Sequence, residues 1–223
     1  MTMPAAVLPA LASVLGVVAI VSAYAYAVIR GDQQFGLHNL PDITHCVLKQ
    51  PERGLFLTIF MPACMLMAGS WMLGAPNSKT AWIFGVVGSL LLVLGEAMLD
   101  AKPNWTIHTI GASGFFLCTM VAQVARAWAP SARETRASLN AKRLIAGFNL
   151  GLLVLDGVLA LCKAPAWAPN LIEWTLSFTV AAFHATFAYD LRNARIVLEH
   201  TTVAPAPIAT RTEALLAATH SKC

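Results

Sequence analysis

Apolar residues run in six long stretches that are separated by short polar segments. The stretches cover residues 7–29, 54–73, 81–99, 105–128, 144–162 and 171–191. Each is close to the roughly 20 residues that a helix needs to cross a hydrocarbon core of about 30 Å. The pattern predicts an all-α, polytopic membrane bundle of six transmembrane helices within residues 1–200. Residues 201–223 are rich in Ala, Pro and Thr, which predicts a flexible cytosolic tail.

The composition supports a membrane protein and excludes a soluble globular domain. The chain is 57% hydrophobic and only 12% charged, whereas soluble domains carry about 25% charged residues. Its 223 residues leave room for one bundle and no separate soluble domain. We expect membrane lipids as partners, with other membrane proteins or a second copy as further candidates, and no nucleic acid.

Lys and Arg residues are distributed unequally between the two sides of the predicted bundle. If the N-terminus faces the cytosol, the cytosolic segments hold ten of them: Lys79, Arg126, Arg133, Arg136, Lys142, Arg143, Arg192, Arg195, Arg211 and Lys222. The opposite side holds five: Arg30, Lys49, Arg53, Lys102 and Lys163. The positive-inside rule therefore predicts that both termini are cytosolic. The arginines between the fourth and fifth helices could also contact anionic lipid.

Ionisable residues inside the predicted helices gather on the luminal or extracellular side. Such residues are costly in a bilayer and usually face the interior of a bundle. The candidates for a ligand or lipid-headgroup site are His108, Glu173, Asp156, Glu96 and Asp100, together with Asp42 and His45 from the loop over residues 30–53. Three interpretations stay open: a headgroup or ligand site, a protonation-sensitive or metal site, and acids that only hydrogen-bond neighbouring helices. Asp190 lies near Arg192 and Arg195, where an interfacial ion pair is expected.

No motif assigns a metal, a cofactor or a catalytic residue. The chain has no HxxxH, HExxH or CxxC pattern, and Ser113 and Ser177 lack the context of a nucleophilic serine. We therefore expect no cofactor and no metal.

Cysteine and glycine positions give two further predictions. Cys46 and Cys162 both fall on the predicted luminal side, where a disulfide between them is chemically allowed. Small residues let membrane helices approach closely. Close helix packing, inside one bundle or in a homo-oligomer, is therefore expected at Gly147, Gly151, Gly111 and Gly114.

Three stretches resemble a known family. They are Leu40-Pro41-Asp42-Ile43 followed by Pro51-Glu52-Arg53-Gly54-Leu55-Phe56, then His108-Thr109-Ile110-Gly111-Ala112, then Glu173-Trp174-Thr175 followed by Phe178 and residues 186–190. In order and spacing they are similar to the DRAM/Sfk-like family of six-helix membrane proteins, which includes autophagy modulators and relatives that remodel GPI-anchor lipids.

The resemblance implies six helices, cytosolic termini, and a place in the plasma membrane or in the lysosome, Golgi or ER. It transfers no catalytic residue, and Glu96, Asp156 and His184 match no motif position. We expect a non-enzymatic protein that binds or organises lipid or a membrane partner. The alternatives are a lipid-remodelling enzyme or its essential partner, using His108 with Glu173 or Asp156 as acid and base, and an accessory subunit of a larger membrane complex.

Overall fold

The computed structural model describes residues 2–34, 36, 39–98, 105–132 and 134–197. Within them, six long helices follow one another: α1 (Val7–Ile29), α2 (Glu52–Gly74), α3 (Lys79–Ala97), α4 (Trp105–Trp128), α5 (Arg136–Leu161) and α6 (Trp167–Asp190). The first five are long and apolar enough to cross a membrane. The prediction of an all-α membrane protein is confirmed to that extent, and the crossing by α6 stays a prediction. Asp100 and the tail over residues 201–223 lie outside the described residues.

Two helices begin a full turn or more before the apolar stretches indicated. α5 begins at Arg136 rather than at residue 144. Its first two turns are polar and carry Lys142 and Arg143, so the apolar stretch did not include them. The Thr135 hydroxyl caps this start by accepting a hydrogen bond from the backbone N–H of Ser138 at 3.2 Å. α6 begins at Trp167 rather than at residue 171. Counting apolar residues therefore underestimates helices whose ends leave the hydrocarbon.

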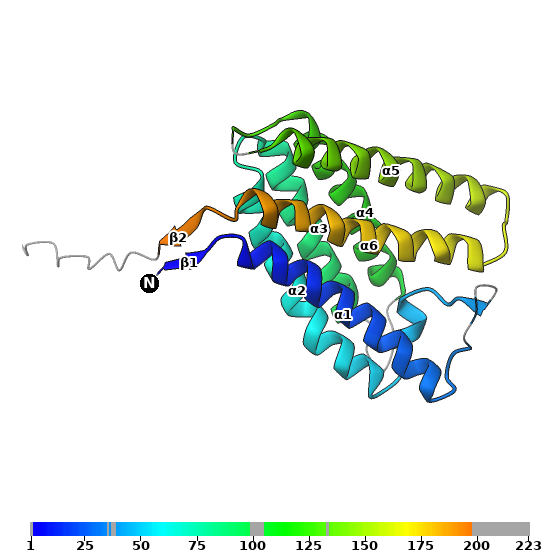
Figure 1. The fold of residues 1–223 in the computed structure, drawn as a ribbon. Helices are drawn as coiled ribbons and strands as arrows, with labels where there is room; N and C mark the ends of the chain where they lie inside the picture. Colours follow the sequence, from blue (N-terminus) through cyan, green and yellow to red (C-terminus); the bar gives the residue numbers. More distant parts are fainter. Residues whose placement is uncertain (1, 35, 37–38, 99–104, 133, 198–223) are drawn as a thin grey trace, which may run out of the picture.

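The helices form a closed ring (Figure 1). Each helix packs against the next one in sequence, and α6 packs against α1. Glycines bring the backbones of α3 and α4 into close contact, since a Cβ on Gly111 would lie 2.6 Å from the Cα of Gly95. A Cβ on Gly147 or Gly151 would meet nothing within 4 Å. Those two glycines of α5 therefore make no close helix contact within the described chain, and their role in an oligomer stays a prediction.

α1 and α6 pack antiparallel to each other. Before α1, strand β1 (Thr2–Pro4) pairs with strand β2 (Arg195–Val197), which follows α6. Further along, the Ser13 hydroxyl donates a hydrogen bond to the carbonyl of Ala181 at 2.9 Å. Near the other end, the rings of Tyr24 and Trp174 meet edge to face with centroids 5.3 Å apart. We call the end with β1 and β2 the terminal end. The loop end is the opposite one, with residues 30–34 and 39–51, which include the short helix η2 (Thr44–Val47).

Candidate functional site

The first turns of α6 hold the segment over residues 40–43 against the loop end. The Asn170 amide donates a hydrogen bond to the carbonyl of Leu40 at 2.8 Å. The indole N–H of Trp174 donates to the carbonyl of Pro41 at 2.9 Å. The backbone of Ile43 also interacts with the Glu173 carboxyl group. Positions 170, 173 and 174 share one helical face because residues three and four apart are neighbours on a helix.

Asp42 is fixed at the edge of this segment. Its Oδ1 accepts hydrogen bonds from the backbone N–H of His45 at 2.7 Å and from His45 Nδ1 at 2.6 Å. The imidazole of His45 is half exposed and stacks on Trp105, with centroids 5.8 Å apart. Asp42 therefore faces α6, whereas His45 lies on the outer surface of the loop end.

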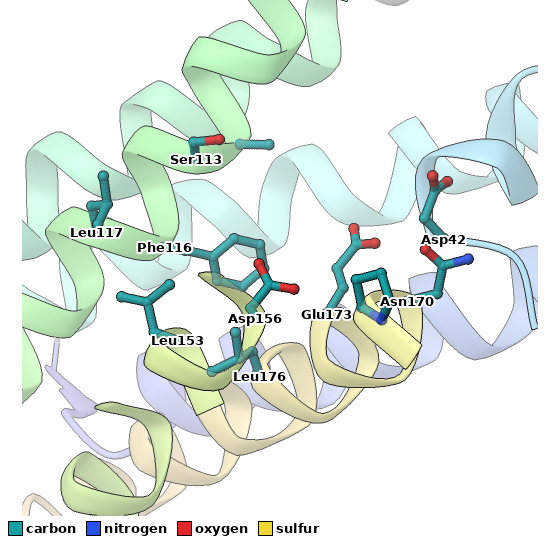
Figure 2. Close-up of a pocket in the computed structure, with 11 residues that line it drawn as sticks. Asp42, Ser113, Phe116, Leu117, Leu153, Asp156, Asn170, Glu173 and Leu176 are labelled. Atoms are coloured by element: carbon teal, nitrogen blue, oxygen red, sulfur yellow. The ribbon is translucent and has the colours of Figure 1, made fainter. Parts of the chain in front are cut away.

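A cavity of about 380 Å³ lies beside Asp42, between α4, α5 and α6. Figure 2 shows Asp42, Asn170 and Glu173 at one side of it, Leu117 and Leu153 at the other, and Asp156 between them. Ala112, Ser113, Phe116, Pro169 and Leu176 complete the lining. Leu117 is 55% exposed, so the cavity opens to the surroundings of the bundle on the α4 side. The site is therefore polar towards the loop end and apolar deeper in the bundle.

Asp156 belongs to a polar stripe on α5. Lys142, Asn149 and Asp156 are seven residues apart and so share one face of the helix. Lys142 and Asn149 are fully buried and hydrogen-bonded to side chains of neighbouring segments. Among the described residues, none gives Asp156 a hydrogen bond or an ion pair. Asp156 therefore faces the cavity, whereas Lys142 and Asn149 face partner side chains.

The charges around the cavity are all of one sign. Asp42, Asp156 and Glu173 line it, and no Lys, Arg or His of the described chain does. The groups that act electrostatically on Glu173 are the carboxylates of Asp42, Glu96 and Asp156. Carboxylates accept hydrogen bonds when ionised, so the polar side is suited to a donor group, and most of all to a cation.

His108 and Glu96 form a separate buried cluster that does not line the cavity. His108 Nδ1 donates to the carbonyl of Gly95 at 3.3 Å, and its Nε2 lies 2.9 Å from the hydroxyl of Thr44. Because a carbonyl can only accept, Nε2 accepts from that hydroxyl. Glu96 Oε1 is 4.0 Å from His108 Nδ1. The cluster ties η2 to α3 and α4.

The site residues expected from the sequence therefore fall into three groups. Asp42, Asp156 and Glu173 meet at the cavity, His108 and Glu96 meet beneath η2, and His45 lies on the surface beside Asp42. Among the described residues, no three His, Cys, Asp or Glu side chains are placed to hold a metal ion.

The disulfide considered between Cys46 and Cys162 is not formed. Both cysteines are free thiols. Cys46 is buried in η2 and its Sγ lies 3.4 Å from the carbonyl of Asp42, to which it donates. Burial raises the pKa of the Cys46 thiol to about 12. Cys162 is exposed directly after α5, so the two thiols have different surroundings.

Sequence reasoning missed a buried ion network at the terminal end. Asp190 pairs with Lys142, rather than with Arg192 or Arg195 as expected. Lys142 also binds Glu134, and Glu134 lies 2.7 Å from the guanidinium of Arg126. Lys142 and Arg126, two of the cations counted for orientation, are therefore buried and paired and do not face lipid. The seven-residue spacing on α5 was the signal that could have shown Lys142 to face inwards.

A second polar contact in the middle of the bundle was also missed. The amide of Asn149 donates to Gln123 Oε1 at 2.9 Å and accepts from the Thr179 hydroxyl at 2.6 Å. His184, which follows Thr179 on α6, is fully buried. Its ring meets that of Trp71 edge to face, with centroids 5.1 Å apart. Neither ring nitrogen of His184 has a hydrogen-bond partner among the described residues.

The comparisons with known proteins identify a family. The family model described as Frag1/DRAM/Sfk1/Cwh43P N-terminal domain matches residues 4–194, which is most of the chain. No curated protein and no solved structure matched the chain.

Proposed function

The chain belongs to the Frag1/DRAM/Sfk1/Cwh43P family, and from this membership and the cavity we propose that it is a multi-pass membrane protein that binds a membrane amphiphile. The amphiphile would place its polar group beside Asp42, Asp156 and Glu173 and its apolar part beside Phe116, Leu117 and Leu153. The observation that carries the proposal is the change from polar to apolar lining along one cavity.

The position of the cavity agrees with the way a lipid lies in a bilayer. Its polar side is at the loop end, where the helices begin and end, and its apolar side is deeper among the membrane-spanning helices. The volume of about 380 Å³ falls in the range of roughly 300–1,000 Å³ for small-molecule sites. A lipid with two long chains would occupy it with its headgroup and the first part of a chain, and the remainder would stay in the bilayer.

The cavity is also accessible from the hydrocarbon. α5 is the least buried of the five apolar helices, and Leu117 on the facing side of α4 is exposed. An amphiphile could therefore enter sideways between α4 and α5 without passing through the loop end.

The geometry favours binding over acid–base catalysis. The enzyme interpretation needs His108 beside Glu173 or Asp156, within hydrogen-bond reach of a substrate. His108 does not line the cavity, and both of its ring nitrogens are already engaged by Thr44 and Gly95. We therefore assign the cavity carboxylates a binding role.

A substitution that fills the cavity tests the proposal. We expect Leu153→Trp to remove most of the lipid that the protein retains after extraction in mild detergent, because the indole would occupy the apolar side. Native mass spectrometry of the whole protein measures the retained lipid. Leu150→Trp is the matched control, since Leu150 lies on the same helix with its side chain exposed.

The comparison between these two variants decides the proposal. Loss of retained lipid in Leu153→Trp, with retention unchanged in Leu150→Trp, supports the site. Equal retention in both variants, or a wild type that retains no lipid, contradicts it.

A further inference from the structure

We infer that the group held at the polar side of the cavity is a primary ammonium, as in amine-headed membrane lipids. This inference rests on the proposed function and adds the chemical class of the ligand. It starts from an imbalance of charge: three carboxylates line the cavity, and among the described residues no cationic side chain lines it with them. Ionised groups in a membrane are stable only when they are paired or hydrated, so a cation in the cavity would compensate them.

The same protein shows how it holds a primary ammonium. At the terminal end, Lys142 Nζ is bound by the carboxylates of Glu134 and Asp190 and by the hydroxyl of Ser138 at 3.0 Å. The ring of Phe187 lies beside it, with its centroid 5.6 Å from Nζ. Two carboxylates, one hydroxyl and one aromatic ring therefore surround this ammonium, whose side chain is fully buried.

The cavity offers the same set of groups without the ammonium. Asp156 and Glu173 supply two carboxylates, Ser113 supplies a hydroxyl and Phe116 supplies an aromatic ring. The correspondence includes position on α5, because Asp156 and Lys142 lie on one helical stripe two heptads apart. At the terminal end, the bound ammonium is the side chain of Lys142 itself. Asp156 instead faces a cavity and has no partner in the described chain.

The lining distinguishes a primary ammonium from a quaternary one. A primary ammonium has three N–H donors, and the carboxylates of Asp156 and Glu173 and the hydroxyl of Ser113 are acceptors for them in the lining of the cavity. Quaternary ammonium ligands make no such hydrogen bonds and are usually held by several aromatic faces. Phe116 is the one aromatic residue that lines this cavity in the described chain. An ethanolamine-type headgroup or a sphingoid amine therefore fits better than choline.

The test compares headgroups that differ only in methylation. The full chain is placed in nanodiscs that contain equal amounts of phosphatidylethanolamine and phosphatidylcholine with identical acyl chains. Native mass spectrometry after release into detergent measures which lipid remains bound. We expect phosphatidylethanolamine to be enriched about tenfold over phosphatidylcholine, which corresponds to about 1.4 kcal/mol, with the mono- and dimethylated lipids between them.

Asp156→Asn is the decisive variant: Asp156 has no hydrogen bond or ion pair among the described residues, so we expect the variant to keep the fold. We expect it to abolish most of the enrichment while a lipid is still retained. Asp32→Asn is the matched control: it removes a carboxylate at the same end that pairs with Lys49 at 2.6 Å and does not line the cavity. It should leave the enrichment unchanged.

The outcomes separate this inference from the proposed function. Equal retention of the two lipids in the wild type, or an enrichment that survives Asp156→Asn, overturns the ammonium site but leaves amphiphile binding standing. Absence of any retained lipid overturns both. If the enrichment is found, competition with free ethanolamine identifies the source of the group: displacement means that the amine alone suffices, and no displacement means that the whole lipid is required.

Discussion

At the scale of single residues, the lack of a side chain on Gly85 lets α2 and α3 pack closely together. Trp71 of α2 is fully buried, and its indole lies against Gly85 of α3. A Cβ on Gly85 would come within 2.2 Å of the indole ring. The other side of Trp71 is filled by Phe183 and Phe187 of α6, with centroids 5.7 and 5.2 Å away. The ring therefore has no space into which it could move.

Gly85→Ala should destabilise the bundle. Overpacking of a filled core costs about 1–3 kcal/mol, and the neighbours of Trp71 are themselves large and buried. The measurement is the thermal unfolding midpoint of the purified protein in a fixed detergent. Gly147→Ala is the control, because its Cβ would meet nothing within 4 Å and Ala favours the helix by up to about 1 kcal/mol over Gly. Equal midpoints for the two variants would show that the Trp71 contact is unimportant.

Residues in the family motifs have mainly structural contacts, and the sequence could show their spacing but not their partners. Trp174 binds the carbonyl of Pro41, His108 lies against Thr44, and Gly111 faces Gly95. In two of these three pairs the partners are more than 60 residues apart in the chain. Local patterns contain no information on such distant pairs, so the sequence grouped His108 with the cavity carboxylates although the fold separates them.

At the scale of elements, α5 shows what hydrophobic length can and cannot predict. The apolar middle of α5 predicted a helix. The prediction did not include the first two turns, because they carry cations. Those turns are helical because Lys142 is neutralised by Glu134 in the preceding loop and by Asp190 of α6. The partners could not be assigned from sequence, since Arg192 and Arg195 are nearer to Asp190 along the chain.

The loop between α4 and α5 should make the stability of the protein depend on acidic pH. Burial alone would raise the pKa of Glu134, but hydrogen bonds from Lys142 and the backbone of Ser131, with the charges of Lys142 and Arg126, outweigh it and hold the pKa below its usual value of 4.5. A carboxyl whose pKa is lower in the folded state stabilises that state fully above its unfolded pKa. This contribution is lost as the pH falls below about 4.5.

Glu134→Gln tests this linkage. Because its side chain is 2% exposed, removing one partner of the buried ion pairs should cost about 3 kcal/mol at neutral pH. Unfolding midpoints measured between pH 7 and pH 3 should fall for the wild type below about pH 4.5 and stay flatter for the variant, so that the two curves converge. Parallel curves over the whole range would mean that another carboxyl sets the acid sensitivity.

At the scale of the whole molecule, the contacts between α1 and α6 bear on how many times the chain crosses the membrane. α6 carries Glu173, His184 and Asp190, and it is the one long helix of the described chain that is not among the five apolar enough to cross a membrane. It nevertheless runs antiparallel to α1 from the β1–β2 pair to the contact of Trp174 with Tyr24. α1 has 23 residues and α6 has 24, so a bilayer that contains α1 over its full length would contain α6 as well. Six crossings would then place both ends of the described chain on one side.

Cysteine labelling on either side of α6 tests this topology. In a background without other cysteines, Cys162 reports the side reached before α6, and Asn193→Cys reports the side reached after it; both positions are exposed. The excess of Lys and Arg on the segments at the terminal end predicts that this end is cytosolic. A membrane-impermeant maleimide should therefore label Cys162 from the luminal or extracellular side, and should label Asn193→Cys only after the membrane is permeabilised. Labelling of both positions from the same side would mean that α6 does not cross, and the reverse pattern would mean that the bundle has the opposite orientation.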